Sequence, residues 1–200
     1  MNFKKYLIKF SLILILFSTF VEKSFSLEPG KFVQSVVDEA SAVLTKNFTK
    51  EQKIEKLRSI AKKSVDIKGI GFYSLGQHRK NLSDDQKKVY SKLFESYFLK
   101  SFASRLSEYT DPKINVTGSE KLNEKYTIVS SVLVATDKRP EVMIDWRIYT
   151  KNPDKPIIRD LIIEGLSLAR TLKEEFNSII QSNDGNINAL FANFKEFVNK

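Results

Sequence analysis

The amino-acid sequence predicts one α+β domain in which helices pack on an antiparallel sheet. Apolar residues recur every three or four positions up to about residue 112, every second position to 164, and every three or four positions again to the end. The chain has 200 residues, 42% of them apolar, which suffices for one core. Helices, then strands with short connections, then helices are typical of this class.

Residues 1–26 differ from the rest of the chain and have the features of a secretory signal peptide. Lys4, Lys5 and Lys9 precede an apolar run over 10–21, which is shorter than the roughly 20 residues of a spanning helix. Ser24 and Ser26 have the spacing of a cleavage site. We expect cleavage after Ser26, a mature domain over 27–200, and a periplasmic location. An uncleaved N-terminal anchor is the alternative.

Helices are predicted on both sides of the strands. Thr49 with Gln52, and Ser83 with Gln86, have capping-box spacing and predict helix starts. Gly76 is expected to end a short helix or turn. The expected helices cover about 31–47, 50–65, 84–109, 166–181 and 186–198, and the segment 66–81 is expected to hold the short helix or turn.

Four strands are predicted between the helices, at 113–120, 124–136, 140–151 and 156–164, with the first turn at Gly118. Short connections make the sheet antiparallel, and we expect it to curve like an NTF2-like cone. Alternation places Tyr126, Ile128, Ser130, Val132 and Val134 on one face of the second strand. In the third strand Val142, Ile144, Trp146 and Ile148 oppose Met143, Asp145, Arg147 and Tyr149.

Composition excludes several kinds of chemistry. There is no cysteine and only one histidine, so disulfides, thiolate zinc sites and multi-histidine metal sites are excluded. The net charge is +9, but removal of 1–26 leaves 29 basic and 23 acidic residues, or +6. The basic residues are mostly lysines interleaved with acids, which argues against nucleic acid as a partner. We find no catalytic or nucleotide-binding motif and expect no metal and no cofactor.

A few polar residues could still carry chemistry. His78 is either a general base in a cavity or an ordinary loop histidine. Asp145 and Arg147 share a strand face, either at a cavity mouth where Arg147 meets an anionic head group or on a solvated surface. Asp160 and Glu164 are a possible acid–base pair. The abundant apolar faces fit either an ordinary core or a cavity for a lipid-like ligand.

The order of several motifs resembles the MlaC family, also called the toluene-tolerance family. The motifs are Asp66-x-x-x-Ile70-x-x-Tyr73-x-Leu75-Gly76, Leu82-Ser83-x-x-Gln86-x-x-x-Tyr90-x-x-Leu93-Phe94, Asp145-Trp146-Arg147 and Asp160-x-x-x-Glu164-Gly165-x-Ser167-Leu168, with Tyr109 and Phe176. The resemblance covers about 30–198. His78 replaces an aromatic residue usual in the family, and 155–158 lack its usual tryptophan.

The resemblance implies a periplasmic carrier that holds a glycerophospholipid by its acyl chains and maintains outer-membrane lipid asymmetry. It implies two partners: an inner-membrane ABC transporter complex with an MCE-domain ring subunit, and an outer-membrane lipoprotein–porin complex. The resemblance implies a lipid pocket between the sheet and the helices, and the periodicity of the apolar residues selects candidates for its lining. These are Phe94, Phe98, Val132, Val134, Ile144, Trp146, Ile163, Leu168, Leu172 and Phe176, with Arg147 at the mouth.

Two other functions remain open at this stage. One is a small lyase or isomerase on a similar cone-shaped scaffold, using Asp145 or Asp160 with Tyr149 or His78. A carboxylate and a tyrosine pointing into one closed cavity would favour it. The other is a non-lipid adaptor of the cell envelope, which a filled core would favour.

Overall fold

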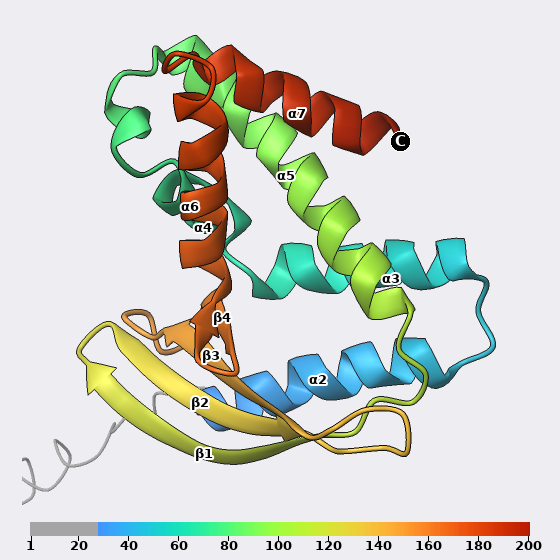
Figure 1. Cartoon of the computed structure of the whole chain (residues 1–200). Coiled ribbons are helices and arrows are strands. Elements are labelled where there is room, and N and C mark those ends of the chain that lie inside the picture. The colour runs from blue at the N-terminus through green and yellow to red at the C-terminus, as the bar shows by residue number, and fades with distance from the viewer. Residues whose placement is uncertain (1–27) are drawn as a thin grey trace, which may run out of the picture.

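A computed structural model describes residues 28–200, so the predicted signal peptide lies outside the described residues. The described part is an α+β domain, which confirms the predicted class. N-terminal helices lead into one antiparallel sheet, and two more helices follow it (Figure 1). No helix of this part is long and apolar enough to cross a bilayer.

The helices begin where the sequence offers caps. Thr49 and Ser83 each form a complete capping box with Gln52 and Gln86, as predicted. Gly76 adopts a φ of +55° and separates the short helix from the turn that follows, which also confirms the prediction. The bounds are α2 Pro29–Thr45, α3 Lys50–Ser64, α4 Ile67–Ser74, the 3-10 helix η1 Gly76–Lys80, α5 Asp84–Ser107, α6 Leu168–Gln181 and α7 Ile187–Asn199.

The sheet has five strands in chain order, not the predicted four. They are β1 Ile114–Asn123, β2 Tyr126–Leu133, β3 Val142–Tyr149, β4 Ile157–Ile163 and β5 Leu166–Ser167. The extra strand is a two-residue return from β4 through Glu164 and Gly165, both with positive φ. Gly118 is not a turn, because the ladder continues through a register shift there and the hairpin closes between Asn123 and Tyr126.

One face of the sheet, which we call the core face, meets the helices. On β2 it consists of Thr127, Val129, Ser131 and Leu133, which are all buried. Its partners on β3 are Ile148, Trp146, Ile144 and Val142. Helix α2 packs along β1 and β2, while α4 and α6 contact β4. In Figure 1 the sheet curves below α2, and α4 to α7 form a separate layer of helices above.

The main core joins these two layers. Val129, Trp146 and Ile148 from the sheet belong to the same buried cluster as Phe94 and Phe176 from α5 and α6. Aromatic rings dominate its helical half: Tyr90, Phe94, Tyr97, Phe98, Phe176, Phe191 and Phe194. The helical layer is therefore held to the sheet by large apolar side chains.

Candidate functional site

A hollow of about 310 Å³ opens where α4 and the start of α6 meet the β1–β2 hairpin end of the sheet. We call it the arginine hollow. Its wall combines two guanidinium groups and a carboxylate with aromatic and aliphatic side chains. The lining residues are Gly69, Ile70, Tyr73, Leu122, Asn123, Tyr126, Arg147, Arg159, Asp160 and Ala169. Ile70 and Ala169 belong to the main core, so this polar mouth adjoins the apolar interior.

The two arginines of the hollow differ in how firmly they are held. The Arg159 Nε lies 2.5 Å from Asp66 Oδ2, and its guanidinium stacks 4.9 Å from the Tyr149 ring centre. Arg147 Nη1 lies 3.6 Å from Asp160 Oδ2, and its side chain is 40% exposed. That separation exceeds a hydrogen bond. Arg147 can therefore turn its donors toward an anionic ligand, whereas Arg159 is ion-paired with Asp66, although its Nε makes no aligned hydrogen bond.

Asp160 is the most deeply buried carboxylate described, with 3% of the residue exposed. The Ser167 hydroxyl donates to its Oδ2 at 2.6 Å, and the Ala169 backbone N–H donates to its Oδ1 at 3.0 Å. Both oxygens therefore fix the first turn of α6 to β4, where a negative charge also complements the helix dipole. This arrangement makes Asp160 a structural anchor of the hollow.

Most of the apolar residues proposed as pocket lining converge on the main core. Phe94, Phe98, Trp146, Leu172 and Phe176 are buried in it, and Ile144 and Leu168 pack against it while remaining partly exposed. The Trp146 indole N–H donates to the Ser131 hydroxyl at 2.8 Å, which satisfies the one polar atom of that side chain. The chain therefore brings seven of the ten candidates together.

Three candidates lie elsewhere. Val132 pairs with Met143 on the opposite face of the sheet, so the expectation that it shares a face with Trp146 is wrong. Val134 follows the end of β2, where its backbone N–H donates to the Lys113 carbonyl. Ile163 pairs with Ile144 but is 43% exposed at the end of its strand. The alternation of apolar and polar residues along β2 does not decide which of its faces is buried, because both faces carry apolar side chains.

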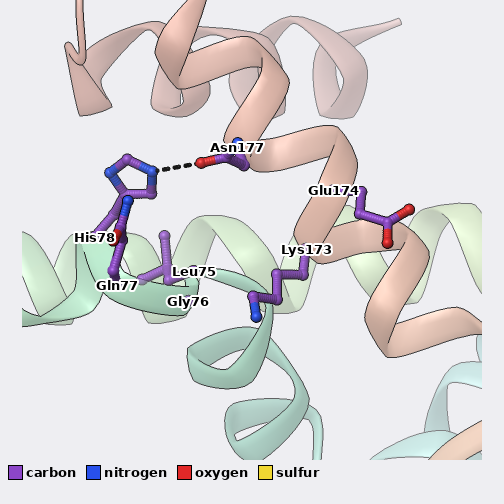
Figure 2. Close-up of a pocket in the computed structure, with 7 residues that line it drawn as sticks. All are labelled: Leu75, Gly76, Gln77, His78, Lys173, Glu174 and Asn177. Atoms are coloured by element: carbon purple, nitrogen blue, oxygen red, sulfur yellow. Dashed lines mark hydrogen bonds between the residues drawn. The ribbon is translucent and has the colours of Figure 1, made fainter.

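His78 lies in a different hollow of about 300 Å³, between η1 and α6. Its Nε2 is 3.0 Å from Asn177 Oδ1, and Figure 2 shows the Glu174 side chain pointing away from the imidazole ring.

Asp145, another candidate of the lyase alternative, accepts a hydrogen bond from the Ser130 hydroxyl at 2.7 Å. The residues of the hypothetical lyase site are thus divided between separate places. Residues 28–200 hold no group of three side chains suited to a metal ion.

The sequence analysis did not identify three residues that line the arginine hollow: Arg159, Tyr73 and Tyr126. The register of β3 and β4 shifts between Arg147 and Ile148, so Arg159 has no direct partner across the ladder. A bulge of this kind leaves no periodic signal. The adjacent charges Arg159-Asp160 within an apolar strand were the one available hint.

The geometry defines an α+β domain with an apolar interior and a small amphiphilic mouth. Over residues 34–196 the sequence matches the family described as MlaC protein, and the chain belongs to that family. A solved structure from Ralstonia solanacearum, described as a phospholipid-binding protein in complex with a phospholipid, has the same fold. It is similar over 86% of this chain and 97% of that chain, with a TM-score of 0.72 and 18% sequence identity.

Proposed function

We propose that this protein is a periplasmic phospholipid carrier. The observation that carries the proposal is the arginine hollow, whose polar mouth adjoins a core built from two apolar layers. Family membership and a similar fold described with a bound phospholipid support the same conclusion. The proposal includes export by the segment 1–26, docking at an inner-membrane ABC transporter complex and an outer-membrane lipoprotein–porin complex, and maintenance of outer-membrane asymmetry.

The physical need for such a carrier follows from the cargo. Burying a methylene group is worth about 0.8 kcal/mol, so two acyl chains represent on the order of 20 kcal/mol of unfavourable exposure to water. Transfer through an aqueous compartment therefore requires an apolar container. Ligand pockets span about 300 to 1,000 Å³, so the arginine hollow, at about 310 Å³, has room for a head group rather than for two chains.

We propose that the acyl chains enter between the helices and the core face of the sheet. Ile144 and Leu168 are only partly buried and pack against the main core, to which Trp146, Leu172 and Phe176 belong. In this arrangement the rings shift apart to admit the chains, which replace one apolar contact by another. The exchange leaves no polar group unpaired, but separating close-packed rings costs free energy, which burial of the acyl chains must offset.

The head group is proposed to lie in the arginine hollow, with its phosphate against Arg147. Because Arg147 lies on the face of β3 opposite Trp146, the chains would pass into the interior beside Ile70 and Ala169, which line the hollow and belong to the main core. A guanidinium pairs well with a phosphate, and the weak contact with Asp160 leaves its donors available. Arg159 is neutralised by Asp66, so Arg147 is the guanidinium offered to the phosphate.

The hollow does bring the Asp160 carboxylate together with Tyr73 and Tyr126, as the enzyme alternative requires. Both oxygens of Asp160, however, already accept structural hydrogen bonds, which argues against a role in proton transfer.

Organic extraction and mass spectrometry of the purified mature protein test the proposal. We expect glycerophospholipid in the extract, and uptake from phospholipid vesicles after delipidation. A protein that carries none and takes up none contradicts the proposal. Arg147→Gln is expected to weaken uptake roughly fivefold, as for a partly exposed charged contact, while the same change at the exposed Arg170 leaves it unchanged. Equal phospholipid uptake by both variants would contradict the proposed contact between Arg147 and the phosphate.

A further inference from the structure

Within residues 28–200 the positive charge is concentrated in one short segment. Residues 46–63 contain seven basic and two acidic side chains, a net charge of +5. The remainder of 28–200 contains 22 basic and 21 acidic residues, a net charge of +1. The segment comprises α3 and the turn before it. We call it the basic α3 surface; its basic residues are Lys46, Lys50, Lys53, Lys56, Arg58, Lys62 and Lys63.

Only part of this charge is compensated within the chain. Arg58 pairs with Glu55 at 2.6 Å, and Lys62 pairs with Glu95 of α5 at 3.2 Å. The Lys53 ammonium donates to the Leu44 carbonyl at 2.8 Å. Four exposed lysines form no ion pair with any carboxylate of residues 28–200: Lys46, Lys50, Lys56 and Lys63. Lys56 lies over the Phe48 ring, 4.7 Å from its centre.

The surface lies apart from the arginine hollow. Helix α3 packs on α2 and α5 and contributes no lining residue to the hollow. In Figure 1 the start of α3 lies at the right edge of the molecule, whereas α4 and the tip of the β1–β2 hairpin lie to the left. A macromolecule bound to the start of α3 would therefore leave the mouth accessible.

We propose that the basic α3 surface docks an acidic protein partner. The inference rests on the proposed function, since a carrier must meet the proteins that load and unload it. Clustered lysines attract an acidic surface over a distance and speed encounter without requiring tight packing. Such contacts release readily, which suits a carrier that binds repeatedly and only for a short time.

A membrane surface fits the same charges less well. Helices that bind bilayers insert large apolar side chains beside their basic residues. The large apolar residues of α3 instead face the protein: Leu57 and Ile60 are buried, and Ile54 packs against the smaller core cluster. Docking through the start of α3 would also turn the arginine hollow away from the bilayer.

The test compares two variants of the mature protein that change the net charge equally. One reverses the four exposed lysines of the surface to glutamate. The control reverses four exposed lysines near the ends of the sheet strands, at Lys125, Lys138, Lys151 and Lys155. The probes are a fluorescent polyglutamate peptide and phosphatidylglycerol vesicles, each at low and high salt. Circular dichroism checks that both variants fold, and neutral Lys→Gln versions replace any variant that does not.

We expect polyglutamate binding to fall about tenfold or more in the α3 variant, in line with the loss of electrostatic steering, and far less in the control. Equal losses in both variants would mean diffuse attraction and overturn the proposal. So would absent polyglutamate binding, or vesicle binding that depends on the four α3 lysines. Lipid extraction from the same preparations reports on the proposed function separately, because neither variant replaces a residue that lines the arginine hollow or belongs to the core.

Discussion

Asp160 offers the sharpest stability prediction, because its carboxylate joins β4 to the first turn of α6. Replacing it with alanine removes the acceptors of the Ser167 hydroxyl and the buried Ala169 N–H, and also the weak contact with Arg147. We expect a less stable fold in which the start of α6 is loosened. A catalytic carboxylate would behave differently, since its removal commonly leaves stability unchanged or raised.

The magnitude follows from the three contacts. A buried N–H left without a partner costs about 1–3 kcal/mol. The Ser167 hydroxyl is partly exposed and can turn to water, so its bond adds about 1 kcal/mol. The ion pair with Arg147 adds less than about 1 kcal/mol, because that side chain is 40% exposed and screened. We therefore expect a loss of about 3 kcal/mol for Asp160→Ala.

Urea unfolding measures this loss, followed by the fluorescence of the single tryptophan, Trp146, and by circular dichroism. Asp160→Asn is the matched variant, because its amide oxygen can still accept from Ala169. We expect it to lose about 1 kcal/mol, a typical value for one weakened hydrogen bond. An unfolding free energy for Asp160→Ala within about 0.5 kcal/mol of the original, the usual range of neutral surface changes, would refute the structural role.

Three further predictions concern the helical layer. A Cβ at Gly71 would lie 2.6 Å from the Phe94 ring, so Gly71→Ala should cost about 1–3 kcal/mol in thermal unfolding, and Phe94→Leu should relieve part of this. Gly76 has a φ of +55°, so Gly76→Ala should cost about 1–2 kcal/mol. Burial raises the pKa of the Tyr90 hydroxyl; the unfolded chain therefore ionises first, and stability should fall above about pH 10, by up to about 1.4 kcal/mol per pH unit.

Each of these has a clear contrary result. Gly71→Ala with unchanged stability would mean that α4 and α5 are farther apart than described, and an additive double variant with Phe94→Leu would mean that the two positions do not touch. Stability of Gly76→Ala equal to the original would contradict the positive φ. Tyr90→Phe should flatten the alkaline decline, and an unchanged pH profile would contradict the buried, neutral hydroxyl.

Local signals in the sequence predict much of the fold. The capping boxes at Thr49 and Ser83 predict two helix starts, because each satisfies backbone donors within a few residues. The end of α4 before Gly76 also depends only on nearby residues, because glycine readily adopts the positive φ found there. Each of these features depends on neighbours in the chain, which sequence reasoning can evaluate.

The features that the sequence does not predict depend on distant contacts. Val129 and Val132 are equally suited to a core, and only the packing of α2 against β1 and β2 decides which face is buried. The β-bulge beside Ile148 brings Arg159 to the hollow without any periodic signal. The seven candidates that do converge were named from helical spacing and the β3 pattern, where one face is markedly more apolar.

The central claim is that lipid is held on the core face of the sheet, and a pair of variants tests it most directly. Ile144 and Val132 lie on neighbouring strands, are both partly buried, and point to opposite faces. The measurement is the phospholipid content of purified Ile144→Glu and Val132→Glu proteins by extraction and mass spectrometry. We expect Ile144→Glu to be folded and nearly empty, and Val132→Glu to be loaded like the original. A loaded Ile144→Glu protein beside an empty Val132→Glu protein would contradict the account.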